Sequence, residues 1–490
     1  MPKKQPQLAK LSRPRLHNAV SRERLFALLD EARIHKPAIC VVGPPGAGKT
    51  TLVASWLDTR GIKGIWYQAD SGDAELATFF YYLNEGARPF THKAQRSLPL
   101  LTPEYLQDIE SFSRRFFRQL FARLPVGAVL VLDNYQEIGP EQKLHQIIAQ
   151  AVDELPRGIT LIAISRQNPP DSYARLIANQ NVSLVNWGNL KLTIEETHAL
   201  TAGLVQLNDL QVAELHQKSG GWTAGLILLL ERWRHGGDLS GTTESESLHE
   251  VFNYFAGQIF DQMPAQSQDE LLRLSYLPRM TARMAEDLIG TVTASLLLED
   301  LHRRQLFTDR RLAEQRVYQF HALFHAFLQH RAQLTFNSDQ DADIARRSAQ
   351  ILEINEQSEE AFPLYLRCGD VRAAISAILG QASRLISQGR WRVVVEWIDA
   401  LPKEVVENNC WLLHWYGAAK TLIDPKAARD ALKASHEVAT RHNDLMCQVQ
   451  AAAGVIQTYV FEYTNFRAMD QWIEALKALL EQVTVFDSAE

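Results

Sequence analysis

Apolar and polar positions alternate in two different ways along this chain, and the change falls near residue 190. From about residue 37 to 190, short apolar runs rich in β-branched residues are separated by stretches of helical periodicity. Such runs are typical of buried strands in a parallel sheet that helices cover. The expected strands are 39–42, 64–68, 128–133, 160–165 and 182–187. We therefore predict an α/β domain for this part of the chain.

Beyond residue 190 the pattern is almost entirely helical. Helices are expected over 195–202 and 210–234. Residues 265–335 show helices, then a short hairpin of 305–308 and 317–320 around a charged turn, Asp309-Arg310-Arg311, and then another helix. Helices with a terminal hairpin indicate a winged helix. From about residue 340 onward, helix pairs recur roughly 35 residues apart, which is typical of TPR-like repeats.

A phosphate-binding pattern follows the first expected strand directly. It fits G-x-x-x-x-G-K-[ST] and lies between strand 39–42 and a helix expected to begin near Lys49. The glycines let successive N–H groups point inward, and the helix adds the positive end of its dipole. Lys49 is predicted to reach the β- and γ-phosphates of ATP or ADP, and Thr50 to bind Mg²⁺. The predicted nucleotide-binding residues here are Gly43, Pro44, Pro45, Gly46, Ala47, Gly48, Lys49, Thr50 and Thr51.

Two further polar residues stand at the ends of apolar strands. Asp133 ends strand 128–133 and Arg166 follows strand 160–165. Ligands bind beyond the carboxyl ends of parallel strands, so both side chains should converge on the phosphate loop. Asp133 is predicted to hold Mg²⁺ and Arg166 to contact the γ-phosphate, which makes Lys49, Asp133 and Arg166 the candidate catalytic set. The alternatives are that Asp133 caps the next segment and that Arg166 is a surface arginine.

Asn134 follows Asp133 at the position where many ATP hydrolases carry a second acid that polarises the attacking water. This asparagine predicts slow turnover, so we expect at most a slow ATPase used as a switch. Glu137, one turn further on, could replace that acid.

Three histidines suggest a metal site at first sight. His321 and His325 are spaced to share one helical face, and His330 follows them. The glutamate that makes H-E-x-x-H a zinc site is missing and no third ligand is evident, so we reject a metal site here.

Composition narrows the class of protein. A hydrophobic fraction of 46%, a charged fraction of 22% and a net charge of -6 are typical of a globular chain and exclude a globally basic nucleic-acid binder. The basic arm with Lys3, Lys4, Lys10, Arg13 and Arg15 has no apolar core for a secretion signal. The longest apolar run, 226–230, is far below the roughly 20 residues of a membrane span. Four cysteines lack CxxC spacing. We expect a cytoplasmic protein without membrane contact.

The 490 residues are too many for one core. The predicted divisions are a basic arm with a flanking helix over 1–36, a nucleotide-binding domain over 37–190, a helical domain over 191–260, a winged helix over 261–335 and TPR-like repeats over 336–490. The last expected helix, 478–485, resembles an ordinary repeat rather than a capping end, so we expect more protein to follow.

An ordered series of motifs resembles the STAND class of signalling NTPases, and within it the MalT-like branch of large LuxR-type transcriptional regulators. The resemblance runs from about Leu11 to the end of the chain. Besides the phosphate loop and Asp133-Asn134-Tyr135-Gln136, it rests on Arg13-Pro14-Arg15-Leu16, Trp66-Tyr67, Ser165-Arg166, Gly220-Gly221-Trp222-Thr223-Ala224-Gly225-Leu226 and Phe320-His321-Ala322-Leu323-Phe324.

This resemblance implies a bistable switch. ADP would be clamped between the nucleotide-binding, helical and winged-helix domains, whereas ATP and a signal would open the clamp and permit self-association. By the same resemblance His321 touches the ADP β-phosphate, Arg166 senses the γ-phosphate, and the helical repeats take a small-molecule or protein inducer. Thr223 stands where many relatives have a proline against the adenine. No C-terminal helix-turn-helix is visible, so DNA contact is expected only through an output domain outside this sequence.

Two other functions compete with this one. The first is a working AAA-like ATPase, a loader or remodeller, which the missing second acid disfavours. The second is a regulator that binds DNA through its own winged helix, with Arg303, Arg304, Arg310 and Arg311 on phosphates. Basic clusters are more often solvated surfaces.

Overall fold

The computed structural model describes residues 8–16, 19–91, 97–139, 142–202, 205, 207–234, 253, 256–257, 260–304, 306–312, 316–462 and 466–482. Contacts divide the chain into two compact units. The first unit comprises Met1–Ala74, Tyr82–Leu98 and Ser113–Ile351, and the second comprises Glu75–Tyr81, Pro99–Phe112 and Leu352–Glu490. Lys3 and Lys4 of the basic arm lie outside the described residues.

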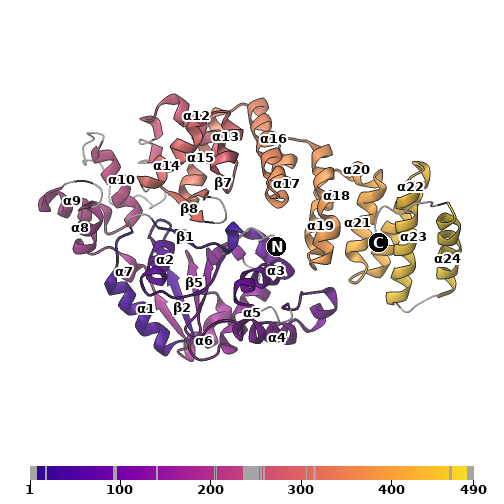
Figure 1. Ribbon diagram of the computed structural model, residues 1–490, viewed down its shortest axis with the longest axis horizontal. Helices are drawn as coiled ribbons and strands as arrows, with labels where there is room; N and C mark the ends of the chain where they lie inside the picture. Colours follow the sequence, from indigo (N-terminus) through magenta and orange to yellow (C-terminus); the bar gives the residue numbers. More distant parts are fainter. Residues whose placement is uncertain are drawn as a thin grey trace, which may run out of the picture. The chain divides into compact units, whose positions relative to one another are not determined.

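A five-stranded parallel sheet forms the centre of the first unit (Figure 1). Its strands are β2 (Ala38–Val42), β3 (Gly64–Gln68), β4 (Val129–Asp133), β5 (Thr160–Ser165) and β6 (Val182–Val185), in the order β3-β4-β5-β2-β6. Every residue of β2, β4 and β5 is buried, because helices cover both faces of a parallel sheet. The predicted α/β fold is therefore confirmed.

The last strand ends earlier than the sequence predicts. Trp187 belongs to the short helix α7 (Trp187–Leu190) and not to β6. Asn186 caps this helix by accepting a hydrogen bond from the backbone N–H of Asn189, and the Asn189 side chain returns the contact. This capping box starts a helix at Trp187, because the Asn186 side chain accepts a hydrogen bond from a backbone N–H of the first helical turn. The strand therefore ends before it.

Helices cover the two faces of this sheet. α1 (Glu23–His35) and α2 (Lys49–Thr59) lie on one side, and α5 (Gln142–Asp153) lies on the other (Figure 1). Leu25 and Phe26 of α1 pack with Trp56 of α2 in one buried cluster beneath β2. The remaining helices of this region are α3 (Leu76–Ala87), α4 (Ile109–Phe121) and α6 (Ala174–Ala178). The cluster fixes the start of α2 against the end of β2.

Three helices follow the sheet: α8 (Ile194–Ala202), α9 (Asp209–Ser219) and α10 (Thr223–Arg234). The helix expected over 210–234 is thus two helices. Gly220 and Gly221 separate them with φ angles of 55° and 74°, a left-handed conformation that terminates a helix. The break turns the N-terminus of α10 toward the end of β2, as described below.

The winged helix consists of α12 (Ala265–Leu274), β7 (Met280–Thr281), α13 (Ala282–Ile289), α14 (Thr293–Arg303), β8 (Thr308–Leu312), β9 (Arg316–Phe320) and α15 (Ala322–Thr335). Asp309-Arg310-Arg311 lies within β8 and pairs with β9, so the predicted charged turn is wrong. Alternation along β8 directs Asp309 and Arg311 to one face and Arg310 to the other. Gln305, the expected start of this hairpin, lies outside the described residues.

A segment from the start of the chain completes the sheet of the winged helix. Strand β1 (Pro14–Arg15) pairs antiparallel with β8, with Pro14 opposite Arg311. The sheet order is β1-β8-β9-β7. No pattern in the sequence predicts this pairing, because two residues are too few to show a strand period.

The second unit is built of sequential helices. They are α17 (Ser358–Arg367), α18 (Val371–Ser387), α19 (Trp391–Asp399), α20 (Lys403–Glu407), α21 (Cys410–Lys420), α22 (Pro425–Arg441), α23 (Leu445–Glu462) and α24 (Phe466–Leu480), with α16 (Ser338–Ile354) leading into them. Gly389 separates α18 from α19 at a φ of 80°, and a Cβ there would lie 2.2 Å from the Leu101 carbonyl oxygen. The glycine therefore permits a close approach of 99–112 to the helices.

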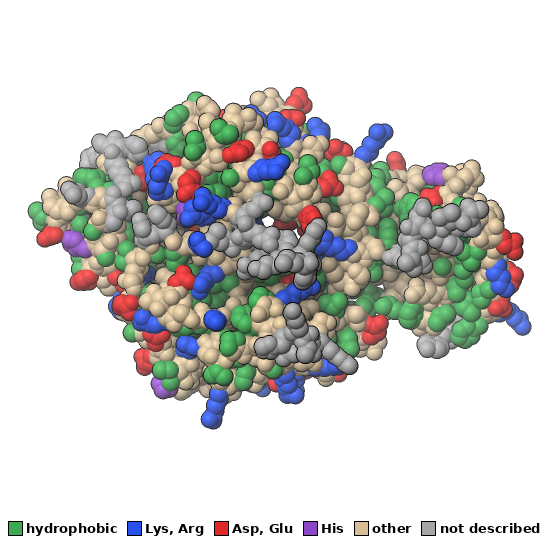
Figure 2. Space-filling model, in the orientation of Figure 1, with side chains coloured by type: hydrophobic (Ala, Val, Ile, Leu, Met, Phe, Trp, Pro, Cys, Tyr) green, Lys and Arg blue, Asp and Glu red, His purple; other side chains and the backbone are tan. Residues whose placement is uncertain are grey.

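Large apolar side chains are exposed on the last two helices, at Val460, Phe461, Phe466 and Leu480. Figure 2 shows hydrophobic side chains gathered over this end of the second unit. Among the described residues, no helix is long and apolar enough to cross a membrane.

Candidate functional site

The phosphate loop joins the end of β2 to the start of α2. Gly46 and Gly48 have φ angles of 71° and 75°, which side chains rarely tolerate, and Gly48 is the N-cap of α2. A Cβ on Gly46 would lie 2.4 Å from the Cβ of Ala224. The loop can therefore curl its N–H groups around an anion at the helix N-terminus.

Lys49 is buried at the first position of α2. Its Nζ donates hydrogen bonds to the carbonyl oxygens of Gly43, at 2.7 Å, and Pro44, at 2.8 Å. Burial lowers the pKa of Lys49 to about 8; repulsion from Arg166 acts in the same direction and Asp133 opposes it. A bound phosphate would stabilise the charged form of Lys49, because it supplies a full negative charge where the loop carbonyls supply only dipoles.

Asp133 ends β4 directly beside the loop. Its Oδ1 accepts hydrogen bonds from the Thr50 hydroxyl, at 2.9 Å, and from the Asn134 backbone N–H, at 3.0 Å. Burial raises the pKa of Asp133, against the opposing effects of Arg311 and Thr50. A hydroxyl and a carboxylate in contact are hard oxygen ligands that suit Mg²⁺. Among the described residues there is no group of three His, Cys, Asp or Glu side chains for a metal, so such an ion would need ligand or water oxygens as well.

Arg166 follows β5 and is about one-third exposed. Its backbone N–H donates to Gln136 Oε1 at 3.0 Å, and its guanidinium lies 4.0 Å from Glu137 Oε1. Lys49, Thr50, Asp133 and Arg166 form one side of a cavity, and we call them the phosphate-loop wall.

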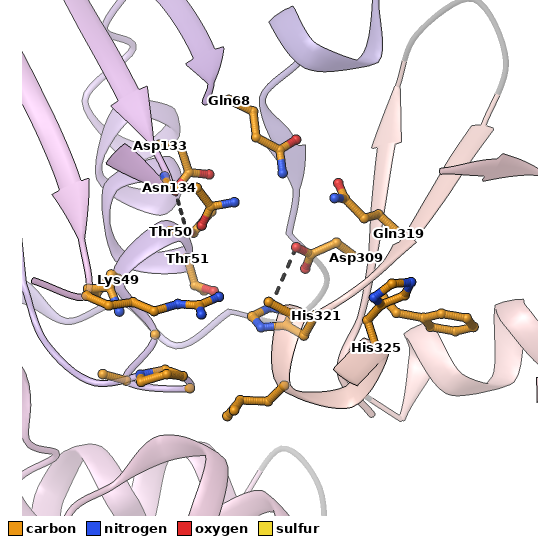
Figure 3. A pocket seen from close by; sticks show the side chains of 18 of the residues that line it. Lys49, Thr50, Thr51, Gln68, Asp133, Asn134, Asp309, Gln319, His321 and His325 are labelled. Carbon is orange, nitrogen blue, oxygen red and sulfur yellow. Dashed lines mark hydrogen bonds and ion pairs between the residues drawn. The ribbon is translucent and has the colours of Figure 1, made fainter. Parts of the chain in front are cut away.

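The winged helix supplies the opposite side of this cavity. We call Asp309, Arg311, Gln319 and His321 the winged-helix wall, because all four line the cavity. Figure 3 shows Asp309, Gln319 and His321 across from Lys49, Thr50 and Asp133. The cavity has a volume of about 210 Å³. The side-chain oxygens of Gln68 and Gln319 and the Nε of Arg311 are buried there without a hydrogen-bond partner in the described structure.

His321 precedes α15 as its N-cap residue, and its Nε2 lies 3.6 Å from Asp309 Oδ2. Burial alone would lower the pKa of His321, but the ion pair with Asp309 outweighs burial and raises it. Burial likewise acts to raise the pKa of Asp309, and His321 overcomes it, so this pKa is lowered. His325 donates instead to the Ser275 carbonyl oxygen at 2.8 Å. His321 lies just before the helix, but both histidines line the cavity, as their spacing of four residues predicts.

The structure brings most of the predicted site residues to this cavity. Residues 45–51, Asp133, Arg166 and His321 all line it. Gly43 and Pro44 do not; their carbonyl oxygens hold Lys49 instead.

A second, mostly apolar cavity of about 190 Å³ adjoins the phosphate loop. Gly46, Gly48, Thr51 and His321 border both cavities. Its other walls come from the N-terminal segment, the helices after the sheet and the winged helix, and include Leu16, Val20, Leu192, Leu200, Thr223, Ile227 and Phe307. Apart from Thr223, sequence reasoning missed these residues, because apolar side chains at helical spacing are indistinguishable from an ordinary core.

The N-terminus of α10 holds the phosphate loop from outside. Trp222 Nε1 donates to the Pro45 carbonyl oxygen at 2.9 Å, and the Ala224 backbone N–H donates to the Gly46 carbonyl oxygen at 3.0 Å. These two contacts give the Gly-Gly-Trp-Thr-Ala-Gly motif a structural role, which is to hold the phosphate loop.

The four arginines of the basic cluster in the winged helix interact with other groups of the protein itself. Arg304 pairs with Glu231 at 2.9 Å, Arg310 pairs with Glu299 at 3.0 Å, and Arg303 lies 3.3 Å from Asp300. Arg311 is buried and donates to the Ser12 carbonyl oxygen at 2.8 Å. These contacts disfavour the alternative in which the four arginines contact DNA phosphates.

Comparison with known proteins agrees with this architecture. Residues 256–341 match the family model of the MalT winged helix domain. The chain is 26% identical over 467 residues to the HTH-type transcriptional regulator MalT of Vibrio cholerae, covering 92% of this chain and 51% of that protein. It is also 26% identical over 438 residues to MalT of Cronobacter sakazakii, covering 85% of this chain and 48% of the relative. The chain thus spans about half the length of the curated relatives it matches.

Among solved structures, a signal transduction ATPase with numerous domains (STAND) and a tetratricopeptide repeat sensor from Pyrococcus horikoshii has a similar fold. The TM-score is 0.60 at 16% identity, and the match covers 97% of this chain and 72% of that one. This likeness shows a shared fold, in which the phosphate loop follows the first strand of the parallel sheet. The winged-helix match, the sequence relatives and this fold together support a MalT-like STAND ATPase.

Proposed function

We propose that this chain is the nucleotide-operated switch of a MalT-like transcriptional regulator, in which ADP holds a resting arrangement and ATP with an inducer permits self-association. The observation that carries the proposal is the shared cavity: the phosphate-loop wall and the winged-helix wall face each other across about 210 Å³. A ligand between two domains stabilises the arrangement that it fits best.

The cavity pair suits a nucleotide in one orientation. Phosphates would lie in the first cavity, on the N–H groups of the loop and Lys49, and the base would occupy the adjoining apolar cavity near Thr223 and Leu200. Thr50 and Asp133 would hold Mg²⁺, which would neutralise phosphate charge. The Gly43 and Pro44 carbonyls would release Lys49 to the β- and γ-phosphates.

The two walls would distinguish diphosphate from triphosphate. His321, whose pKa Asp309 raises, would donate to the β-phosphate, and Arg166 would contact a γ-phosphate from the opposite side. Adding a γ-phosphate changes the charge between the walls, so the two nucleotides would favour different placements of the winged helix.

We propose that hydrolysis is slow, so that the protein works as a switch rather than as a motor. Asn134 has a φ of 57° and an amide side chain, which cannot act as a general base. Glu137, the candidate substitute, lies 4.0 Å from the Arg166 guanidinium. We therefore propose that occupancy of the site, more than turnover, sets the state.

The remaining parts of the proposal concern the whole regulator. We propose the domain limits 1–36, 37–190, 191–260, 261–335 and 336–490, with an inducer on the helical repeats, a cytoplasmic location and DNA contact through an output domain outside this sequence. The relatives are named HTH-type transcriptional regulators, which supports such an output.

The test is ADP affinity, measured by calorimetry, for the unaltered chain, His321→Ala and a matched control, His330→Ala. His330 is an exposed histidine on α15, the helix that His321 precedes. We expect His321→Ala to weaken ADP by about tenfold or more, because a charge-assisted hydrogen bond contributes about 1.5–3 kcal/mol, and His330→Ala to have no effect. Equal ADP affinities in all three proteins would contradict the clamp.

A further inference from the structure

Arg311 brings a buried positive charge from the winged helix to the phosphate cavity. Its side chain is only 1% exposed and lines the cavity together with Asp133 and Asp309. One Nη donates to the Ser12 carbonyl oxygen, and the Nε has no hydrogen-bond partner in the described structure. A guanidinium stays charged in proteins, so its burial requires nearby negative charge.

Two carboxylates supply that charge. Asp133 and Asp309 both attract Arg311, whereas Arg279 repels it. Asp309 is also paired with His321. Asp133 and Asp309 line the same cavity as Arg311, and Asp133 is the one of the two that does not pair with His321.

The same carboxylate is the proposed ligand of Mg²⁺. A divalent cation at Asp133 and Thr50 would compete with Arg311 for the Asp133 carboxylate and place two cations in the same cavity, where they repel each other. Arg311 has little freedom to move away, because β8 pairs with β1 on one side and with β9 on the other.

We propose that Arg311 makes the cavity selective for a metal-free nucleoside diphosphate while the winged-helix wall is in place, so that a metal-bound nucleotide is favoured only when Arg311 withdraws. This inference rests on the proposed nucleotide switch and deepens it. Coupling of this kind is reciprocal: if the docked Arg311 weakens metal binding, the bound metal weakens the docking of the winged helix to the same extent.

Calorimetric titration of ADP into the full chain, with Mg²⁺ and with the metal removed by a chelator, tests the inference. For the unaltered chain we expect Mg²⁺ to weaken ADP binding by about fivefold or more, the lower end of typical coupling between sites. In Arg311→Gln, the weakening should disappear or reverse. Arg311→Lys keeps the charge and should retain some weakening.

Arg310→Gln is the matched control. Arg310 is the neighbouring residue on β8, faces the other side of the sheet and pairs with Glu299. It does not line the cavity. This variant should show the same metal effect as the unaltered chain.

Two results overturn the inference: tighter ADP binding with Mg²⁺ in the unaltered chain, or the same metal effect in Arg311→Gln as in Arg310→Gln. The first result needs no variant, so it overturns the inference even if Arg311→Gln does not fold. Thermal melting followed by circular dichroism shows whether Arg311→Gln is folded. Failure of the proposed function itself is distinct, since ADP would then not bind under either metal condition.

Discussion

The two walls of the phosphate cavity are built in different ways. The phosphate-loop wall comes from one short motif and the ends of adjacent buried strands, so its residues are positioned by local turns and by the sheet. The winged-helix wall depends on a hairpin more than 250 residues away, as the sequence numbers of Lys49 and Asp309 show. One wall is therefore set by local sequence, whereas the other exists only where the winged helix packs against the nucleotide-binding domain. In the proposed switch, the first would bind the phosphates and the second would respond to which nucleotide is bound.

The largest effect should come from the phosphate-loop wall. Lys49→Ala removes the buried ammonium at the end of the loop, and truncating a buried charged partner costs about 2 kcal/mol or more. We therefore expect ADP and ATP affinities to fall by about 30-fold or more, measured by calorimetry. Lys63→Ala, at an exposed lysine just before β3, is the control and should bind normally. Retained affinity in Lys49→Ala would mean that the loop is not the phosphate site.

Gly46→Ala should disturb the loop strongly. Gly46 has a φ of 71°, which side chains rarely tolerate, and an added Cβ there would also clash with the Cβ of Ala224. Gly61 has a φ of 62°, but the space around it is open, so only the backbone conformation opposes a side chain there. We expect Gly61→Ala to cost about 1–2 kcal/mol of unfolding free energy, and Gly46→Ala about 1–3 kcal/mol more because of overpacking. Denaturant unfolding measures both. Equal costs would show that α10 does not hold the loop as described.

The contrast between the walls also explains what the sequence could predict. Residues 43–50 predict the phosphate loop, because the loop requires glycines, a lysine and a threonine at fixed spacing. Asp133 and Arg166 are predictable because each stands at the end of an apolar run. Arg311 gives no such signal: a charged residue in Asp309-Arg310-Arg311 is expected in a solvated turn, and only pairing of β8 with β1 and β9 buries it. The break at Gly220 and the helix at Trp187 depend on capping and left-handed backbone, which hydrophobic periodicity does not detect.

Trp222→Phe should produce a smaller effect. Phenylalanine keeps most of the buried ring but loses the hydrogen bond to the Pro45 carbonyl oxygen. A single hydrogen bond of this kind contributes about 1 kcal/mol, so we expect a loss of this size in unfolding free energy and a several-fold weaker ADP affinity. A loss of affinity as large as in Lys49→Ala would instead place Trp222 in direct contact with the nucleotide.

The smallest expected effect is a pH dependence of the winged-helix wall. The pKa of His321 is raised, so its stabilisation is present below the pKa of an unfolded histidine and is lost as the pH rises through the raised value. The pKa of Asp309 is lowered, so its contribution is lost only as the pH falls through that lowered value. The difference in melting temperature between the unaltered chain and His321→Gln should therefore shrink from about pH 5.5 to about pH 8.5. A difference that grows with pH would contradict the His321–Asp309 pair.

The central claim is that diphosphate and triphosphate select different placements of the winged helix. Small-angle scattering of the full chain loaded with ADP, and separately with a slowly hydrolysed ATP analogue and Mg²⁺, tests it most directly, with occupancy checked by calorimetry. We expect a compact ADP-bound particle and a measurably larger or self-associated ATP-bound one. Identical scattering curves from two fully occupied samples would contradict it.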